Sequence, residues 1–476
     1  MRDLVLRALD SAQVAGASFA EVRVEERETQ SISVKNGVVV SLASKGSQGF
    51  GIRVLADGSW GFACSPLLSG PEIDRVARLA VSIARASALT RHREVQLGPK
   101  VLAQGTYRTP FAVDPFLVSI DLKIELLLAA DAAMRSVNGC SVAESSLGSV
   151  RVHKTYANSD GSYLEQDLLE TGGGIVATAV GDGELQKRSW PNSFGRHQGT
   201  GGWELIEDMA LVENGERMAE QAVALLSAPQ CESDVTTLVI DPAQMALQTH
   251  ESCGHAVELD RVLGWEASYA GTSFLTPDRL GMRYGSEHVN IVADGTSPTG
   301  LGTYGWDDEG VPGSVTALVE QGVFVGYLSS RETAALVDRP SSGSARASGW
   351  NRIPLVRMTN VNLLPGTRSR DELISEVPRG LYLETNKSWS IDDKRLNFQF
   401  STEIAWEIKD GKVGRMVKNP TYGGMTPEFW GSCDGVSREW RMWGTTNCGK
   451  GQPGQTMHVG HGAPSARFCN VRVGIL

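Results

Sequence analysis

The feature that most constrains the fold is a two-residue alternation of apolar and polar side chains between residues 18 and 65. It runs through residues 20–25, 31–35 and 49–55, and the turn-forming pairs Asn36-Gly37 and Asp57-Gly58 separate or end these runs. Successive side chains point to opposite faces of a strand, and Asn-Gly and Asp-Gly pairs favour tight hairpin turns. The pattern therefore predicts an antiparallel meander with one buried face.

Helical periodicity accompanies this meander. An amphipathic helix is predicted at the N-terminus, and a second helix over residues 71–87 places a row of apolar side chains on one face: Ile73, Val76, Ala77, Ala80 and Ile83. Two helices of this kind can cover one side of the sheet. Residues 1–95 are therefore predicted to form an α+β domain.

Two further domains are predicted downstream. Residues 110–230 are expected to form a central α+β domain, because helical and strand patterns follow one another there: 121–135 (helix), 148–156 and 173–181 (strands) and 203–227 (helix). Residues 234–476 consist mostly of short strands and Gly or Pro turns, with one well-signalled helix. The predicted fold class is α+β, with N-terminal and central α+β units followed by a mainly antiparallel β domain that carries this helix.

Charge and composition exclude several functions. The 476 residues contain 45 Lys and Arg against 55 Asp and Glu, a formal net charge of -10, and no dense basic run. Nucleic acid and anionic membranes are therefore not expected as partners. No apolar stretch approaches the roughly 18 residues of a membrane span and no secretory signal is evident, so we expect a cytoplasmic protein. The seven cysteines are scattered, which argues against disulfides and for reactive or metal-binding roles.

The strongest helix start in the C-terminal region follows a short apolar strand at residues 237–240. Asp241 is a favoured N-cap residue, Pro242 takes the first helical position, and Gln244 is placed to complete a capping box. A helix is therefore predicted from residue 241 to about residue 260, and it carries the sequence HESCGH at residues 250–255.

This hexapeptide has the residue types of a hydrolytic zinc centre. Neutral imidazoles such as His250 and His255 bind zinc, and the Glu251 carboxylate beside the first of them can accept a proton from water at the metal. The spacing His-Glu-x-x-x-His is one residue longer than the common zinc-peptidase motif. Eight histidines occur in the chain, and two of them flank this glutamate. The alternative interpretation is a pair of ordinary histidines on a half-buried helix.

The five-residue separation has a structural consequence. In a regular α-helix it turns the two side chains roughly 140° apart, which is too far for them to share one small cation. A local i→i+5 bulge would bring both rings to one side, and Gly254 lowers the cost of that distortion. We therefore predict a π-type turn inside this helix.

Beyond the hexapeptide, an ordered series of segments extends along the chain. The segments are HESCGH (250–255), DDEGVPG (307–313), EQGVFVGY (320–327), RMTN (357–360), LPG (364–366), FQFS (398–401), IKDGKV (408–413) and NCGKGQ (447–452). On these segments the chain resembles the TldD members of the TldD/PmbA family of bacterial and archaeal metallopeptidases, over nearly its whole length. The ordered series is more specific than any single motif, and the resemblance implies a peptidase.

The resemblance also implies a ligand set, a substrate and an assembly. Zinc would be bound by His250, His255 and Cys448, with Glu251 as the general base that takes a proton from metal-activated water. The substrate would be a short or unfolded peptide held as an added β-strand. A homodimer, or a heterodimer with a PmbA/TldE-like subunit, is implied as well. The alternative function is a non-catalytic subunit of such a heterodimer, because PmbA-type members lack the metal motif.

From the residues alone, the third ligand stays open. A thiolate at Cys448 is chemically sensible and would leave a fourth position for water. Glu258 lies one helical turn after His255, and Cys253 lies inside the hexapeptide. His458 and His461 form a further candidate ligand pair.

Two other features carry weaker signals. The acidic run at residues 307–309 would suit a second cation site, although a solvated or hydrogen-bonded loop is favoured. The glycine-rich segments 172–174 and 449–452 lack the Gly-Lys-Ser/Thr ending of a nucleotide-binding loop, so turns are predicted there.

Overall fold

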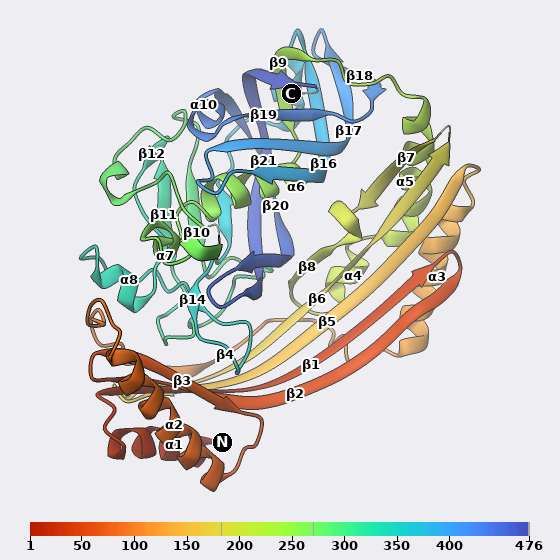
Figure 1. Ribbon diagram of the computed structural model, residues 1–476. Coiled ribbons are helices and arrows are strands. Elements are labelled where there is room, and N and C mark those ends of the chain that lie inside the picture. The colour runs from red at the N-terminus through yellow and green to blue at the C-terminus, as the bar shows by residue number, and fades with distance from the viewer. Residues whose placement is uncertain (182, 270, 475–476) are drawn as a thin grey trace.

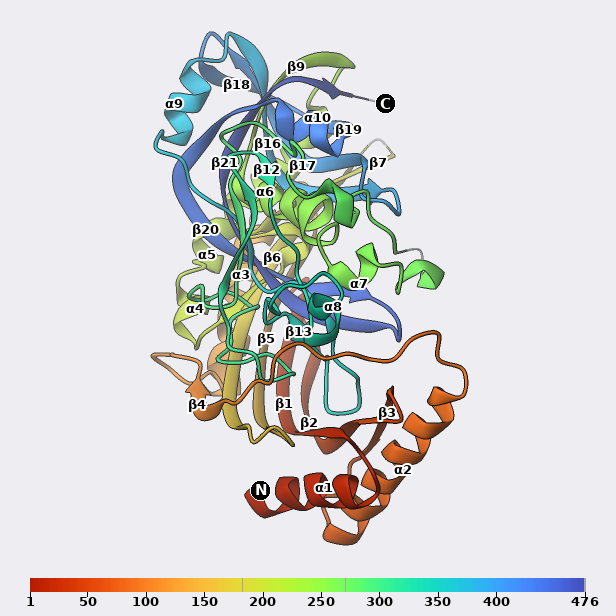
Figure 2. The same cartoon turned by 90° about the vertical axis from the view of Figure 1, so that its left-hand side faces the viewer.

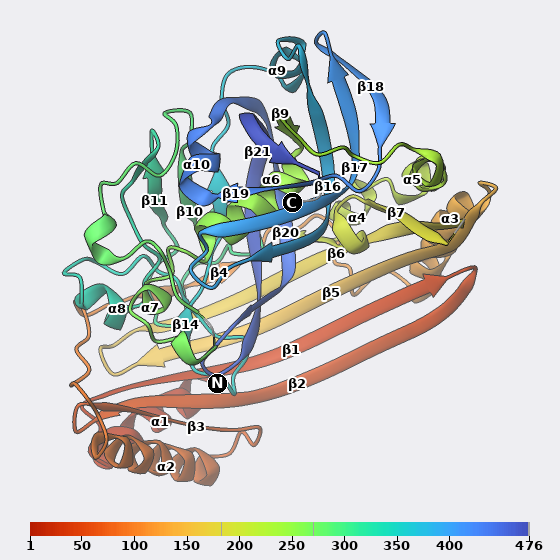
Figure 3. The same cartoon turned by 45° about the horizontal axis from the view of Figure 1, so that its top comes forward.

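The computed structural model describes residues 1–181, 183–269 and 271–474. Its largest feature is a long curved sheet, and a β-rich C-terminal domain lies over the concave side of that sheet (Figure 1). The same division is visible when the top of the molecule is brought forward (Figure 3). The predicted α+β class with a mainly antiparallel C-terminal domain is confirmed.

The long sheet contains the strands of the first half of the chain. They are β1 (Phe19–Lys35), β2 (Val38–Ala56), β3 (Ser59–Ser65), β4 (Gln104–Arg108), β5 (Cys140–Asn158), β6 (Tyr163–Gly181), β7 (Glu184–Trp190) and β8 (His197–Thr200). Their order is β3-β2-β1-β5-β6-β4, and β7 and β8 also pair with β6. Because β1 pairs with β5, the N-terminal and central segments share one sheet. The domain boundaries at residues 95, 110, 230 and 234 stay predictions.

Strands β1, β2 and β3 form the meander that the alternation predicts. Asn36 and Gly37 connect β1 to β2 with φ of 48° and 78°, and Asp57 and Gly58 connect β2 to β3 with φ of 48° and 69°. Two successive residues with positive φ make the hairpin turn whose twist matches that of the strands. The Asn-Gly and Asp-Gly signals are thus confirmed.

Helices cover the two ends of the long sheet. α1 (Arg2–Val14) and α2 (Gly70–Ala88) pack at one end, as Figure 2 shows from the side. α3 (Ile120–Arg135) and α5 (Leu211–Ser227) pack at the other end, with the short α4 (Glu204–Glu207) nearby (Figure 1). Each pair of long helices buries an apolar core of its own against the strands.

Two details of the predicted helices are wrong. Ile83 is 38% exposed, whereas Val81 and Ala84 are buried. Ten residues of helix place Ile83 roughly 80° away from Ile73, off the buried face. The helix predicted over residues 203–227 is divided, because Ala210 lies between α4 and α5 with a left-handed φ of 47°.

The C-terminal domain contains the remaining strands and helices. The strands are β9 (Asp234–Ile240), β10 (Ile291–Asp294), β11 (Val315–Glu320), β12 (Val323–Phe324), β13 (Ala345–Arg346), β14 (Leu355–Val356), β15 (Val361–Leu363), β16 (Arg379–Ile391), β17 (Asn397–Lys409), β18 (Lys412–Val417), β19 (Thr421–Met425), β20 (Cys433–Lys450) and β21 (Gln455–Val473). The helices are α6 (Pro242–Thr249), the π-helical η2 (His250–Gly254), α7 (Leu259–Val262), α8 (Arg331–Ala335), α9 (Arg370–Ser375) and α10 (Thr426–Gly431). Short 3-10 turns are η1 (Ser193–Gly195) in the central segment, and η3 (Ala267–Tyr269) and η4 (Pro277–Arg279).

The main sheet of this domain has the order β16-β9-β21-β19-β17-β18, and β20 pairs with β21. β16 and β9 are parallel, whereas β16–β17 and β20–β21 are long antiparallel pairs. Smaller sheets are formed by β12-β11-β10-β15 and by β13-β14. In the described part of the chain, no helix is long and apolar enough to cross a membrane.

The acidic run at residues 307–309 joins the C-terminal domain to the long sheet. Arg53 Nη2 lies 2.7 Å from Glu309 Oε1, and Lys154 Nζ lies 2.7 Å from Asp308 Oδ1. All three acidic side chains are buried. The run is therefore a buried, hydrogen-bonded loop. Asp308 and Glu309 form ion pairs with the long sheet, and Asp307 accepts hydrogen bonds from backbone N–H groups.

The glycine-rich segments differ from each other. Gly172–Gly174, predicted as a turn, lies within β6. A Cβ on Gly174 would lie 2.4 Å from the carbonyl oxygen of Gly195, so the glycine permits a close backbone approach. The prediction of a turn at these glycines is wrong, whereas the strand predicted to begin there is present as part of β6. After Gly449 and Lys450 end β20, residues 451–454 do form a turn.

Candidate metal centre

The helix that carries the candidate site begins as the sequence predicts. β9 runs directly into α6, and the Asp241 side chain accepts hydrogen bonds from the backbone N–H groups of Ala243 (3.2 Å) and Gln244 (2.9 Å). The reciprocal half of the predicted capping box is not made. The Gln244 side-chain amide instead donates to Tyr422 Oη at 2.8 Å.

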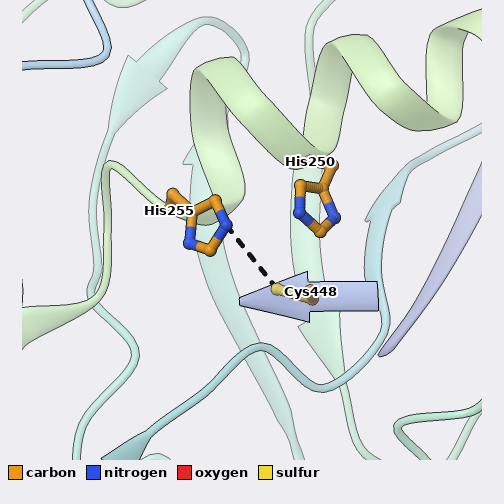
Figure 4. A group of neighbouring side chains, drawn as sticks. All are labelled: His250, His255 and Cys448. Atoms are coloured by element: carbon orange, nitrogen blue, oxygen red, sulfur yellow. Dashed lines mark hydrogen bonds between the residues drawn. The ribbon is translucent and has the colours of Figure 1, made fainter. Parts of the chain in front are cut away.

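The predicted π-type turn is present. In η2 the backbone N–H of His255 donates to the carbonyl oxygen of His250 at 3.1 Å, which is an i→i+5 hydrogen bond. The two imidazole rings consequently face the same side, with ring centroids 4.8 Å apart and planes at 88° (Figure 4). This turn resolves the spacing problem that five residues create in a regular helix.

Gly254 has a packing role in this turn. A Cβ at position 254 would lie 2.2 Å from the sulfur of Met358. The absence of a side chain therefore lets the Met358 side chain lie directly against the turn. This close contact is a reason for glycine that the sequence does not reveal.

Cys448 reaches the histidines from β20 (Figure 4). One ligand atom from each of His250, His255 and Cys448 lies within 4.8 Å of the others, and all three residues are buried. Cys448 Sγ is 3.6 Å from His255 Nε2. The pairing of β20 with β21 shifts register between Thr445 and Cys448, next to this cluster. The structure thus brings together the three residues predicted as ligands.

A third histidine, His461, fixes the tautomer of His250. His461, which is buried, places its Nδ1 3.0 Å from the carbonyl oxygen of Val361 and its Nε2 2.7 Å from His250 Nδ1. A carbonyl oxygen only accepts, so His461 Nδ1 carries the proton and its Nε2 must accept from His250 Nδ1–H. His250 Nε2 is then left with a free lone pair.

A carboxylate does the same for His255. His255 Nδ1–H donates to Glu258 Oε2 at 2.8 Å. The lone pair on His255 Nε2 is therefore free, and it faces Cys448. Glu258 is itself beside Lys450, whose Nζ lies 3.3 Å from Glu258 Oε2 and 2.6 Å from Asp260 Oδ1. Lys450 and Glu258 are fully buried, so this is an interior ion-pair cluster.

The charge state of the cluster suits a metal cation. Burial opposes ionisation of Cys448, but the positive charges of Arg357 and the histidines outweigh it, and the pKa of the thiol lies well below its ordinary value. Burial also holds the pKa of His255 well below its ordinary value, which favours the neutral ring. At His250 burial acts in the same direction, but the neighbouring Cys448 and Glu251 outweigh it and raise the pKa, so a metal bound there displaces a proton. A thiolate and a neutral imidazole are the forms that bind metal.

The other candidate ligands have other roles or partners. Glu258 supports His255 from behind, and His461 does so for His250. His458 pairs with Glu170, its Nδ1 2.5 Å from Glu170 Oε2. Burial raises the pKa of Cys253 to about 12, which keeps it a thiol. Among the described residues, the group of His, Cys, Asp and Glu side chains arranged to hold a metal is His250, His255 and Cys448.

Glu251 and a basic residue lie beside the cluster in a cavity of about 280 Å³. Arg395 Nη1 donates to Glu251 Oε2 at 2.5 Å. The cavity is lined by residues of α6, η2, β16, β20 and the loop at 192–196, including Phe194, Trp389, Asn447 and the three candidate ligands. Both a proton acceptor and space for a substrate therefore adjoin the candidate ligands.

Two residues of this site have roles that the sequence does not reveal. The sequence offers His461 as a ligand, whereas its supporting role depends on a contact across 211 residues of chain. Arg395 contacts Glu251 across 144 residues and lies in a hairpin with no motif of its own. Its neighbours Asp392, Asp393 and Lys394 give the segment the appearance of an ordinary charged turn.

Family models match three consecutive parts of the chain. They are the PmbA/TldA metallopeptidase domain 1 at residues 20–84, the central domain at residues 114–226 and the C-terminal domain at residues 233–475. The chain belongs to the TldD/PmbA metallopeptidase family. The resemblance to TldD that the motifs indicate is confirmed.

Relatives in the TldD/PmbA family cover nearly the whole chain. A metalloprotease of Methanothermobacter thermautotrophicus is 34% identical over 96% of this chain and 95% of its own. A zinc metalloprotease TldD homolog of Saccharolobus solfataricus is 20% identical over 99% of both chains. The coarse function, that of a metalloprotease family member with a candidate metal site, rests on these relatives and on the cluster.

Solved structures share the TldD/PmbA fold. A Thermotoga maritima protein described as a candidate modulator of a DNA gyrase aligns with a TM-score of 0.79 at 19% identity, over 99% of this chain and 100% of its own. TldE from Thermococcus kodakarensis aligns with a TM-score of 0.74 at 17% identity, over 99% of this chain and 100% of its own. At such identities the likeness concerns the fold alone.

Proposed function

We propose that this chain is a zinc-dependent peptidase in which His250, His255 and Cys448 hold the metal and Glu251 is the general base. The observation that carries the proposal is that one ligand atom from each of His250, His255 and Cys448 lies within 4.8 Å of the others, beside a carboxylate, in a member of a metallopeptidase family. This combination does not arise in an ordinary helix with two packed histidines.

The donor set fits zinc. Two imidazole nitrogens and one thiolate are ligands that Zn²⁺ favours, and three protein ligands leave a position for water or substrate, as in catalytic zinc sites. Each imidazole has an acceptor behind its Nδ1–H, which orients the ring and raises its basicity. The relative named a zinc metalloprotease supports the same metal.

The chemistry divides between the metal and the chain. When bound, zinc lowers the pKa of water and polarises a carbonyl group. Glu251 accepts the proton that the attacking water gives up and delivers it to the nitrogen of the leaving amine. The water oxygen bonds to the peptide carbon while the π electrons of the carbonyl group move onto its oxygen, and the C–N bond breaks when the carbonyl group re-forms and the amine takes the proton.

A short or unfolded peptide is the proposed substrate, held as an added β-strand. Within the described sheets β20 pairs with β21 alone, and its residues 444–449 line the cavity. A free strand edge beside the cluster can pair with an extended peptide main chain, which makes recognition tolerant of side chains. Most main-chain groups of a folded protein are already paired within its own structure, so an unfolded segment is the favoured partner.

The assembly and setting belong to the proposal as well. A homodimer, or a heterodimer with a TldE-like subunit, is proposed, and the shared fold with TldE supports the second. The expected setting is the cytoplasm. The alternative of a non-catalytic subunit is disfavoured because the candidate ligands and Glu251 are all present and placed together.

The test is metal analysis of the purified chain, alone and together with a TldE-like subunit, coupled to digestion of a mixed peptide library. We expect one zinc per chain, hydrolysis that a chelator removes and zinc restores, and no hydrolysis by Glu251→Ala, which keeps its zinc. Substantial hydrolysis by Glu251→Ala would refute the role of Glu251. Zinc bound without hydrolysis by any assembly would favour the non-catalytic subunit.

A further inference from the structure

Arg395 occupies an unusual place for a cation. It lines the cavity with His250, His255 and Cys448, and its Nη1 holds Glu251 Oε2 at 2.5 Å. Its Nε–H is buried and has no hydrogen-bond partner among the described residues. A buried donor without a partner calls for one supplied from outside the chain, such as a water molecule or a bound substrate.

The hairpin between β16 and β17 holds Arg395 firmly. The carbonyl oxygens of Asp393 and Lys394 accept backbone hydrogen bonds from Thr272 (3.3 Å) and Phe274 (3.0 Å). The carbonyl oxygen of Arg395 itself accepts the hydroxyl hydrogen of Thr426 at 2.8 Å. Two separate segments therefore fix the backbone at the hairpin tip, and the ion pair with Glu251 holds the guanidinium in the cavity.

The charge of Arg395 works against metal binding. Arg395 lines the same cavity as the three proposed ligands, and its Nη1 lies 2.5 Å from the carboxylate of Glu251, the residue next to His250. A fixed positive charge at this place repels a cation bound by those ligands. In a buried site such repulsion is stronger than in water. Negative charge that develops beside Arg395 during the reaction would explain why a fixed cation lies at this place.

We propose that Arg395 is the oxyanion donor of the peptidase reaction. As water attacks, negative charge accumulates on the carbonyl oxygen of the peptide, and Arg395 donates an N–H to that oxygen while a second N–H keeps Glu251 in place. Arg395 gives up no proton: the proton of water passes to Glu251 and then to the leaving amine. Pre-positioned donors aimed at developing charge are a large source of catalysis. The inference rests on the proposed function, and it names a donor that no sequence motif identifies.

The test compares Arg395→Gln, Arg395→Lys and the matched control Lys394→Gln, which removes an exposed positive charge from the adjacent position. We expect kcat of Arg395→Gln to fall by roughly 100- to 1000-fold, the loss typical for one oxyanion donor, with KM changed less than about threefold. Zinc affinity should be equal to that of the parent or higher, because a repelling charge is gone. Lys394→Gln should match the parent in all three quantities.

Arg395→Lys separates this role from simple neutralisation of Glu251. Lysine keeps the charge and can pair with Glu251 but lacks the planar fork, so its kcat should stay at least about tenfold below the parent. Full activity of Arg395→Lys, kcat of Arg395→Gln within threefold of the parent, or parallel loss of zinc in Arg395→Gln would each overturn the inference. A parent that hydrolyses no peptide refutes the proposed function and this inference together, whereas an active parent with an equally active Arg395→Gln refutes the inference alone.

Discussion

The two histidines of the cluster are supported in opposite ways. Behind His250 the support is neutral, a buried imidazole and a backbone carbonyl contributed by His461 and Val361. Behind His255 it is ionic, the Glu258 carboxylate with the ammonium of Lys450 close to it. Both arrangements leave a free Nε2 lone pair. Neutral hydrogen-bond partners behind His250 and an ion pair behind His255 therefore orient the two imidazole rings in the same way.

The difference concerns charge balance and sequence distance. Two neutral ligands and one thiolate leave a site with zinc at a net charge of about +1, and Glu258 brings the negative charge that lies nearest to His255. Glu258 lies three residues from His255, whereas His461 lies 211 residues from His250. The ionic support is thus local, and the neutral support exists only once β21 is folded onto the helix.

Cys448→Ser should have the largest effect on zinc binding, because it removes one of the three proposed ligands. The variants below change residues that only support a ligand. A neutral hydroxyl is a far poorer zinc ligand, so the loss of zinc affinity should exceed the roughly 10- to 100-fold typical of a supporting residue. Competition with a chelator of known affinity measures it. Cys433→Ser, Cys469→Ser and Cys253→Ser are matched controls and should keep parental zinc stoichiometry. Full zinc and activity in Cys448→Ser would remove this residue from the site.

Glu258→Gln tests the ionic support. It keeps the shape but removes a buried negative charge beside Lys450, which Asp260 then pairs alone. We expect a loss of about 3 kcal/mol of unfolding free energy, together with roughly 10- to 100-fold weaker zinc binding. Denaturant titration of the zinc-free protein isolates the first quantity. A variant as stable as the parent that also binds zinc normally would show that the charge behind His255 is dispensable.

His461→Leu tests the neutral support. It removes the acceptor for His250 Nδ1–H without uncovering a buried charge, so zinc binding should weaken by roughly 10- to 100-fold with a smaller loss of stability than Glu258→Gln. His458→Gln is the matched control on the same strand, since His458 pairs with Glu170. It should bind zinc as the parent does. If instead His458→Gln loses zinc and His461→Leu retains it, the assignment of the neutral support is wrong.

Gly254→Ala tests the π-type turn between His250 and His255, and it should have the smallest effect on zinc affinity. The added methyl group meets the sulfur of Met358, which costs about 1–3 kcal/mol of unfolding free energy. Zinc affinity should change less than tenfold, because Met358 is flexible and can move away. The double change Gly254→Ala with Met358→Ala should suffer a smaller penalty from Gly254→Ala than the single variant. An equal penalty in both backgrounds would mean that backbone conformation, and not packing, requires glycine here.

Local signals in the sequence predicted the elements that local physics determines. Asn36-Gly37 and Asp57-Gly58 predicted the meander because their positive φ values are a property of the turn itself. Asp241 and Pro242 predicted the start of α6, and the five-residue spacing of His250 and His255 predicted a π-type turn. Each of these inferences needed only residues close together in the chain.

Contacts between distant segments could not be predicted in this way. The bond from Arg395 to Glu251 joins residues 144 apart, and the bond from Lys450 to Asp260 joins residues 190 apart. The placement of Cys448 came from the resemblance to a family, since chemistry alone left Glu258, Cys253 and His458 with His461 as rivals. Ala210 breaks a segment of strong helical periodicity through its backbone conformation, which periodicity does not report.

Zinc-edge X-ray absorption of the purified, zinc-loaded chain tests the central claim most directly, because it reads the ligands themselves. The account predicts one sulfur scatterer at about 2.3 Å and nitrogen or oxygen scatterers at about 2.0–2.1 Å, with imidazole multiple scattering from two rings. Cys448→Ser, reloaded with excess zinc, should lose the sulfur shell. A parent spectrum without sulfur, or a sulfur shell that survives in Cys448→Ser, would contradict the site formed by His250, His255 and Cys448.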